Sequence, residues 1–388
     1  MRIQSKIGLC PTAVKRMASA QAESTGIKAA AAPNGYADGM PLPSESPLRV
    51  AITADPEIPV PPRLYGGIER IVDMLVRGLM QRGHDVTLFA NPESQVVCQL
   101  LPYGGARSQN RIDTVANMWH VSRAIQRGQF DVVHSFARLA YLTPLLPLRI
   151  PKIMSYQRAV SPRSVRLGNL LSRGTLSFTA CAAHLVRRWQ SDRNFHVVYN
   201  GVPLETYQCA PRVEPDAPLV YLGRVEEIKG VHLAIEVSKK SRRRLIIAGN
   251  IPQAEHHRRY FAEQIEPHID GKTVEYVGPV DDAAKNRMLG RSAAMLMPLM
   301  WEEPFGIVMA EALACGTPVI GLRRGSLPEI VQEGINGFVC DSVDEMASAV
   351  CRIPEIDRCE CRRIAEDKFS DRVIVDCYER LYRELIWS

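Results

Sequence analysis

The chain has 388 residues, of which 46% are hydrophobic and 23% charged, and its formal net charge at pH 7 is +6. These values exclude a disordered or fibrous protein and leave an ordinary globular protein that is long enough for two domains. Residues 48–205 carry 19 Lys and Arg against 10 Asp and Glu, so this half is basic. Such a half either attracts an anionic partner or is only a solvated surface, and composition does not decide between the two.

The sequence shows no sign of a membrane span, a signal peptide or a metal motif. No run approaches the roughly 18 apolar residues that a spanning helix needs, and the ten cysteines include no CxxC pair. The start, MRIQSKIGLC, lacks the apolar core of a signal peptide. We expect a cytoplasmic protein, with peripheral contact at the inner membrane surface as an open alternative. Residues 1–47, rich in Ala, Ser, Gly and Pro, are predicted to be a flexible extension or an incorrectly assigned start.

From residue 48 onward, predicted strands and helices alternate. The first half has strands at 48–53, 85–90, 131–136, 152–156 and 195–199, with an amphipathic helix at 68–81. The second half has strands at 219–223, 245–248, 274–277, 294–298, 318–321 and 338–340, separated by helices at 230–240, 255–267, 281–291, 306–315, 326–333 and 343–351. This alternation predicts parallel sheets that are covered by helices on both faces.

Two such series predict an α/β protein with two Rossmann-like, doubly wound domains that face each other across a cleft. We place the N-terminal domain at 48–205, the C-terminal domain at 206–370 and a last helix at 371–388. The periodicity of this helix leaves open whether it packs on the C-terminal domain or crosses back to the N-terminal one. Four prolines between 202 and 218 mark the division. Because open α/β sheets bind ligands at the carboxyl ends of their strands, the loops after the strands are the places to search for a site.

The segment GRVEEIKG, residues 223–230, follows a predicted strand and precedes a helix. It places two cations, Arg224 and Lys229, at the carboxyl edge of the second sheet. Arginine offers a fixed fork of donors and lysine a point charge, so together they can neutralise a diphosphate without a metal. Two solvated loop cations are an equally good explanation of this segment taken alone.

The segment WEEPFGIVMAEALACGTP, residues 301–318, also follows a strand and opens a helix. Free backbone amides around Phe305, Gly306 and Ile307 would form an anion site at the helix start, where the helix dipole favours negative charge. The carboxylates of Glu303 and Glu311 can each accept hydrogen bonds from sugar or ribose hydroxyls. The plainer alternative is a helix with ordinary acidic residues.

Weaker signals lie in the first half of the chain. Gly66 and Gly67, in the segment YGGIER, allow a tight turn and close approach of a substrate, and no GxGxxG motif of a nicotinamide enzyme occurs. His134 ends a predicted strand and is either a cleft residue or a buried core histidine. The arginines around the apolar stretch 165–171 favour an ordinary amphipathic element, with docking on anionic lipid or on an acceptor phosphate as the alternative; they are Arg158, Arg163, Arg166 and Arg173.

In this order, the motifs resemble those of the family 4 retaining glycosyltransferases, which have the GT-B fold, and the resemblance runs from residue 48 to the end of the chain. The most specific part is EPFGIVMAE, residues 303–311, which is similar to the E-x7-E motif of that family. The segments GRVEEIKG, YGGIERIVDMLVRGLMQRGHDVTLFA and VVYNGV resemble its diphosphate motif, its glycine loop with the first helix, and its interdomain segment.

The resemblance implies transfer of a hexose from a nucleoside diphosphate sugar with retention of configuration, with no cofactor and no metal. It implies that Arg224 and Lys229 bind the diphosphate, that Glu311 binds the ribose and that Glu303 contacts the transferred sugar. The amides of Phe305, Gly306 and Ile307 would contact sugar and phosphate, and Gly67 would lie near the reacting centre. UDP-glucose is the default donor because it is the commonest in the family.

One position departs from the family pattern. Many relatives carry a histidine after the strand that here reads KIMSY, and Gln157 holds that place. Glutamine donates to a hydroxyl but takes up no proton at neutral pH. We count Gly66, His134 and Gln157 as candidate acceptor or sugar contacts, and expect no nucleic acid partner. Two alternatives stay open, another GT-B enzyme such as a nucleotide-sugar epimerase, and a non-catalytic nucleotide-sugar-binding partner.

Overall fold

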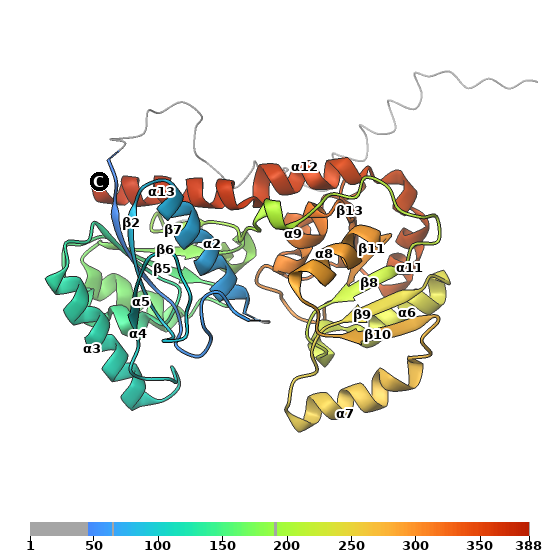
Figure 1. The fold of residues 1–388 in the computed structure, drawn as a ribbon, viewed down its shortest axis with the longest axis horizontal. Helices are drawn as coiled ribbons and strands as arrows, with labels where there is room; N and C mark the ends of the chain where they lie inside the picture. The colour runs from blue at the N-terminus through green and yellow to red at the C-terminus, as the bar shows by residue number, and fades with distance from the viewer. Residues whose placement is uncertain (1–45, 64–65, 190–191, 388) are drawn as a thin grey trace, which may run out of the picture. The chain divides into compact units, whose positions relative to one another are not determined.

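The computed structural model describes residues 46–63, 66–189 and 192–387 and contains two parallel β-sheets (Figure 1). The seven-stranded sheet has the order β3-β2-β1-β4-β5-β6-β7, and the six-stranded sheet has the order β10-β9-β8-β11-β12-β13. All pairings within the two sheets are parallel. The structure therefore confirms the predicted α/β architecture with two Rossmann-like domains.

The N-terminal domain contains seven strands and four α-helices among the described residues. Its strands are β1 Arg49–Thr53, β2 Asp85–Ala90, β3 Gln99–Pro102, β4 Val132–Ser135, β5 Lys152–Tyr156, β6 Leu176–Ala180 and β7 Phe195–Val197. Its helices are α2 Gly67–Gln81, α3 Arg111–Arg127, α4 Leu139–Leu142 and α5 Pro162–Ser172, with short 3-10 helices η1 Thr143–Leu145, η2 Ala183–Trp189 and η3 Leu204–Thr206.

The C-terminal domain supplies six strands and its covering helices. The strands are β8 Leu219–Leu222, β9 Leu245–Ala248, β10 Val274–Gly278, β11 Ala294–Met297, β12 Val319–Leu322 and β13 Gly337–Cys340. The helices are α6 Val231–Ser241, α7 Glu255–Gln264, α8 Asp282–Arg291, α9 Ile307–Ala314, α10 Leu327–Ile330, α11 Val343–Cys351 and α12 Arg358–Phe369, with η4 Glu227–Lys229, η5 Glu266–His268 and η6 Ile353–Glu355. The chain ends with α13 Asp371–Trp387.

Most predicted elements lie within a residue or two of their observed bounds, and the exceptions have local causes. The helix predicted at 255–267 ends at Gln264, because Pro267 cannot continue it and the chain tightens into η5. The helix predicted at 326–333 is only the single turn α10. Strands β3 and β6 and helices α3 and α4 were not predicted. The sequence of β6, LSFTA, buries polar Ser177 and Thr179 and so lacks an apolar run.

The last helix packs on the N-terminal domain, although α12 before it belongs to the other core. Cys361, Ile364 and Phe369 of α12 are buried in the core around the six-stranded sheet. Ile374 and Tyr378 of α13 are buried with α2 and β1 in a core of the seven-stranded sheet. The chain therefore passes from one core to the other at the junction of α12 and α13.

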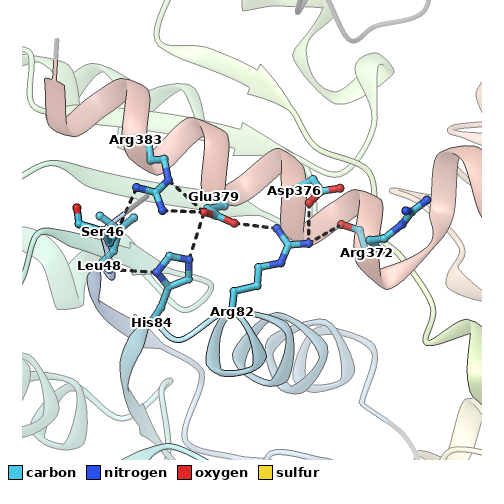
Figure 2. A network of polar contacts seen from close by, with 8 residues as sticks. All are labelled: Ser46, Leu48, Arg82, His84, Arg372, Asp376, Glu379 and Arg383. Atoms are coloured by element: carbon cyan, nitrogen blue, oxygen red, sulfur yellow. Dashed lines mark hydrogen bonds and ion pairs between the residues drawn. The ribbon is translucent and has the colours of Figure 1, made fainter. Parts of the chain in front are cut away.

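A partly buried carboxylate fixes α13 in that position (Figure 2). Glu379 accepts hydrogen bonds from Arg82 at 2.8 Å and from Arg383 at 2.9 Å, and it lies 3.4 Å from Nε2 of His84. Arg82 also pairs with Asp376 at 2.6 Å. Because Arg82 and His84 lie between α2 and β2, this network attaches the C-terminal helix to the N-terminal sheet. Among the described residues, no helix is long and apolar enough to cross a membrane.

Candidate donor-binding site

Lys229 and Glu303, two of the predicted donor residues, meet at the carboxyl ends of two neighbouring strands. Strands β8 and β11 pair with each other, and the loops that follow them carry Lys229 and Glu303. The Nζ atom of Lys229 lies 2.5 Å from Oε2 of Glu303, which also accepts a hydrogen bond of 2.9 Å from the indole of Trp301. The ammonium lies 4.6 Å from the centre of the Trp301 ring. Sequence spacing did not predict this direct ion pair.

A glycine explains how the Lys229 loop approaches β11 so closely. Gly230 follows Lys229 with φ 72°, and a Cβ atom there would lie 1.9 Å from the carbonyl oxygen of Pro298. No residue with a side chain fits at this contact without moving the backbone. The glycine therefore holds the cationic turn against the loop that carries Glu303.

Arg224 stands on the same turn and has its own carboxylate. Its Nη1 atom lies 2.6 Å from Oε1 of Glu226, a residue that is buried although it follows only two positions later. The imidazole of His257 lies 3.8 Å from the same oxygen. Glu226 is a site residue that the sequence analysis missed, and the Arg-x-Glu spacing was the one signal for it. The two predicted diphosphate cations thus each face a carboxylate.

The start of α9 presents backbone amides as predicted. Its N-cap, Gly306, has φ 73°, and no side chain caps the helix. Within the described residues, the amides of Phe305, Gly306 and Ile307 donate no hydrogen bond. The side chain of Phe305 is buried between Tyr199 and Phe369, so it anchors the helix start while its backbone stays available. Uncapped amides at a helix N-terminus favour an anion.

A second helix start lies against the first. Gly67 begins α2, whose N-cap Gly66 also provides no side-chain cap. A Cβ atom on Gly67 would lie 3.4 Å from Cδ1 of Ile307, the first residue of α9. The structure therefore places the predicted glycine loop next to the predicted phosphate-binding amides. The positive ends of two helix dipoles converge at this point.

Glu311 is buried and already has partners. Its Oε1 atom accepts hydrogen bonds from the hydroxyl of Tyr207 at 2.7 Å and from Nζ of Lys285 at 2.5 Å. Burial and the neighbouring carboxylate of Glu311 raise the pKa of Tyr207 far above its ordinary value, so this hydroxyl is a permanent donor. The sequence analysis missed both partners. The role of Glu311 toward a ribose remains a prediction.

The contact network of Glu311 reaches the other domain. Lys285 lies 3.1 Å from Asp282, and Asp282 lies 2.9 Å from Nη1 of Arg70, three residues after Gly67. Burial raises the pKa of Asp282, but the hydrogen bonds and charges of Arg70 and Lys285 outweigh this effect and lower it. Asp282, through Arg70 and Lys285, therefore links the glycine loop to Glu311.

Comparison with known proteins agrees with this geometry. Residues 65–206 match the family model described as Glycosyltransferase Family 4, and residues 210–366 match the model Glycosyl transferases group 1. The chain belongs to the family 4 glycosyltransferases. The first matched region contains the glycine loop, and the second contains the segment GRVEEIKG and the helix of the E-x7-E segment.

Individual relatives of this glycosyltransferase differ in how much of the chain they match. Glycogen synthase from Mycobacterium tuberculosis is 35% identical over 152 residues, which are 37% of this chain and only 35% of that protein. The phosphatidyl-myo-inositol mannosyltransferase from Mycolicibacterium smegmatis is 25% identical over 79% of this chain and 86% of its own length. The crystal structure of AviGT4, a glycosyltransferase involved in avilamycin A biosynthesis, has a TM-score of 0.68 at 25% identity and covers 88% of this chain and 99% of that one.

The N-terminal domain of this family 4 glycosyltransferase carries carboxylates near the glycine loop that the sequence analysis missed. A Cβ atom on Gly66 would lie 2.8 Å from Oε2 of Glu69, whose side chain is buried. Burial, together with the charges of Asp55 and Glu57, raises the pKa of Glu69. Asp55 follows β1, and its Oδ1 atom is buried without a hydrogen-bond partner while Arg158 lies 3.6 Å from Oδ2.

His134 is not an acceptor contact, which corrects that candidate. Its ring is fully buried, 2.6 Å from the hydroxyls of both Tyr382 and Ser155, and packs against Phe136 and Tyr378. Burial lowers the pKa of His134 to about 3, so it stays neutral. The core-histidine alternative is therefore the right one. The sequence offered only a weak signal for this, since His134 follows the apolar pair Val132 and Val133 but precedes Ser135 in β4.

Gln157 lies where the sequence analysis placed it, directly after β5 at the carboxyl edge of the sheet. It is partly buried, and its Oε1 atom accepts a hydrogen bond of 2.8 Å from Asn200. The side-chain oxygen of Asn200, Oδ1, is buried and has no hydrogen-bond partner among the described residues. The amide pair is thus oriented by the segment that leads into the second domain. Contact of Gln157 with a sugar remains a prediction.

Proposed function

We propose that the chain is a retaining glycosyltransferase that moves a hexose from a nucleoside diphosphate sugar to an acceptor hydroxyl, with UDP-glucose as the default donor. The observation that carries this proposal is that the first residues of α2 and α9, Gly67 and Ile307, lie against each other and that neither helix has a side-chain cap. Lys229, in the loop after β8, adds a cation to the same proposed site. Backbone amides, two helix dipoles and a cation form an anion site that needs no metal.

Donor binding would proceed by exchange of an ion pair. Without donor, Lys229 is neutralised by Glu303 at 2.5 Å. A diphosphate offers the ammonium stronger, doubly charged partners, and the released carboxylate of Glu303 then accepts hydrogen bonds from the hydroxyls of the transferred sugar. In this scheme Arg224 supports the diphosphate, and Glu311, whose orientation is held by Tyr207, accepts from the ribose.

The chemical step we propose is substitution on one face of the sugar. The bond between the anomeric carbon and the leaving phosphate oxygen breaks with development of oxocarbenium character, and the acceptor oxygen bonds to the same face. The acceptor proton passes to the leaving phosphate oxygen, so no protein base is needed. Catalysis then depends on stabilisation of the phosphate charge and on positioning of the acceptor.

Binding, transfer and stereochemistry are tested separately with the purified full chain. UDP, GDP and ADP sugars are screened by thermal shift, since a ligand that binds only the folded state raises the melting temperature. Transfer is followed with an acceptor panel in the presence of EDTA, and the anomeric configuration of the product is read by NMR. Lys229→Met is the binding-deficient variant, and Lys272→Met, at an exposed lysine, is its control.

Each outcome assigns the chain to one class. Binding by the wild type that is lost in Lys229→Met, with a product of retained configuration, supports the proposal. Binding without turnover across the panel would indicate a non-catalytic nucleotide-sugar partner, and a modified sugar without acceptor would indicate an epimerase. Loss of activity in EDTA would disprove metal independence, and no binding of any nucleotide sugar would disprove the proposed site.

A further inference from the structure

Helix α3 exposes apolar side chains along one stripe. Ile112 is 79% exposed, Val115 49% and Trp119 52%, and their spacing of three and four residues places them on one helical face. The opposite face carries Val121 and Ile125, which are buried against the sheet. A solvated helix of a globular protein normally has polar residues on its outer face, so α3 is apolar where water would be expected.

Helix α5 has a similar outer face with more charge. Leu167 is 47% exposed and Leu170 78%, and the same stripe carries exposed Arg163, Arg166 and Arg173. The sequence analysis noted this combination of arginine and leucine but favoured an ordinary amphipathic element. In the structure, the leucines are on the outer face of the helix and not on the buried one.

The two outer faces belong to one side of the N-terminal domain. Val121 of α3 and Val165 of α5 are buried in the same hydrophobic core, whereas α2 and α13 contribute to a different one. Figure 1 shows α3, α4 and α5 together on one side of the seven-stranded sheet. Leu148, which is 37% exposed, and Arg149, which is also exposed, lie in the segment between α4 and α5. We call the outer surface of α3, α5 and residues 147–149 the α3–α5 face.

The arginines of this face have no anionic partner in the part of the chain that the structure describes. Among the described residues, no ion pair or side-chain hydrogen bond engages Arg123, Arg127, Arg163, Arg166 or Arg173. Arginines on the surface of α12 do have anionic partners, since Arg362 and Arg363 each pair with a glutamate about one turn away. Positive charge on the α3–α5 face is therefore left uncompensated.

We propose that the α3–α5 face docks on the surface of an anionic lipid bilayer. Exposed large apolar side chains would enter the boundary between headgroups and acyl chains, and the arginines would bind lipid phosphates. A nucleic acid would use the arginines but would leave Ile112 and Leu170 in water. This inference goes beyond the proposed sugar transfer and does not depend on it, because none of these residues lies in the donor site.

Vesicle sedimentation of the full chain tests the proposal. We expect binding to vesicles of equal parts phosphatidylcholine and phosphatidylglycerol, little binding to phosphatidylcholine alone, and weaker binding at high salt. The double variant Arg163→Glu/Arg166→Glu should lower the partition coefficient by about 25-fold or more, at roughly fivefold for each arginine lost. The double variant Ile112→Ser/Leu170→Ser should lower it by about tenfold or more.

Matched variants separate a local surface from bulk properties. Arg287→Glu/Arg291→Glu changes two exposed arginines of α8 and gives the same net charge as the α5 variant. Ile335→Ser removes an apolar side chain that is 42% exposed outside this face. Both controls should bind vesicles like the wild type. All variants should keep the wild-type melting temperature, because the changed side chains are exposed.

Fluorescence gives a readout that sedimentation does not. Trp119 lies on the α3–α5 face, so anionic vesicles should shift the tryptophan emission to the blue, and Trp119→Phe should abolish most of that shift. The proposal is overturned if the wild type does not bind anionic vesicles or binds neutral ones equally well. It is also overturned if the α8 variant Arg287→Glu/Arg291→Glu loses as much vesicle binding as the α5 variant Arg163→Glu/Arg166→Glu. A nucleic acid partner is indicated instead if short duplex DNA displaces the protein from vesicles while Ile112→Ser/Leu170→Ser binds vesicles like the wild type, and this result too overturns the proposal.

Discussion

The ammonium of Lys229 and the carboxylate of Glu303 lie 2.5 Å apart, although the sequence motifs give them different targets on the donor. The two side chains are only 16% and 12% exposed, so little water screens the pair. Because the diphosphate and the sugar hydroxyls would compete for these groups, the pair has to open before either target is bound. If the proposed donor site is right, the free protein keeps the charges of Lys229 and Glu303 paired with each other until a donor binds.

The first prediction follows from this competition. Glu303→Gln removes the charge that holds Lys229, so affinity for a nucleoside diphosphate without sugar should stay the same or rise. Transfer should fall by about tenfold to a hundredfold, the effect of losing a charged hydrogen bond to the sugar. Titration calorimetry with the nucleoside diphosphate and steady-state kinetics measure the two effects.

Lys229→Met is the counterpart of that variant. It removes the cation itself, and the affinity for the nucleoside diphosphate should fall by about tenfold or more. If Glu303→Gln weakened nucleoside diphosphate binding as much as Lys229→Met does, the proposed exchange of partners would be wrong. Glu263→Gln, at an exposed glutamate of α7, serves as the control for removal of a negative charge.

The second prediction concerns the space between the two helix starts. Gly67→Ala adds a methyl group about 3.4 Å from Ile307, which the fold tolerates but which occupies the region where the donor and acceptor would meet. We expect unfolding free energy to change by less than about 0.5 kcal/mol. Transfer should fall by about tenfold or more, since small misplacements at a reacting centre are costly.

A glycine in open space provides the comparison for this variant. At Gly104, a Cβ atom would meet nothing within 4 Å, so Gly104→Ala should leave both stability and transfer unchanged. Chemical denaturation and initial-rate kinetics are measured on the three proteins. Equal activity of Gly67→Ala and wild type would show that the junction of α2 and α9 lies away from the chemistry.

Local sequence patterns were sufficient for most strands of the two parallel sheets and for the loops that carry the candidate donor residues. A buried strand, a short loop and a helix start are encoded within about ten residues, so Lys229, Glu303 and Gly306 could be placed at the same sheet edge before the structure was known. Glycines with positive φ, such as Gly230 and Gly306, also follow local rules. These features depend on neighbours in the sequence.

The partners of the site residues could not be predicted in the same way. Tyr207 is 104 positions from Glu311 and Lys285 is 26 positions from it, and only the packing of α8, α9 and η3 brings them together. Helix α3 escaped prediction for another reason, since its apolar residues Ile112 and Trp119 point outward and obscure the usual amphipathic period.

The third prediction tests the buried pair at Glu311. Lys285→Met leaves a carboxylate that is 3% exposed without its cation, and breaking one partner of a buried pair costs about 3–5 kcal/mol. Denaturant unfolding should show this loss, and donor affinity should fall with it. The exposed pair of Lys240 and Asp344 is the control, since Lys240→Met should not measurably change stability.

A double variant shows whether the two groups act as a pair. Lys285→Met with Glu311→Gln should lose clearly less stability than the sum of the two single variants, because the neutral amide no longer needs a buried cation. Strict additivity of the two losses would mean that the 2.5 Å contact contributes no coupling energy in solution. The same result would leave Glu311 without a fixed orientation toward a ribose.

The fourth prediction is a pH dependence that originates in the core. His134 has a pKa of about 3 in the folded protein, where burial excludes the charged form, against an ordinary value of 6.5. The folded state therefore binds fewer protons than the unfolded state between these values. Stability from this group is complete above about pH 6.5 and is lost as the pH falls toward 3, at about 1.4 kcal/mol per pH unit.

The variant His134→Gln isolates that contribution. Glutamine can still hydrogen-bond to Ser155 and Tyr382 but does not titrate, so the variant should be less stable at pH 7.5 yet lose less stability on acidification. The two unfolding free energies should converge by about 2 kcal/mol between pH 6.5 and pH 5.

His84, His196 and His232, whose pKa values burial also lowers, are present in both proteins and cancel in the difference. His256→Gln, at an exposed histidine, should run parallel to the wild type. Parallel curves for His134→Gln as well would mean that the ring of His134 gains access to protons in the native state, and the neutral core histidine would have to be abandoned.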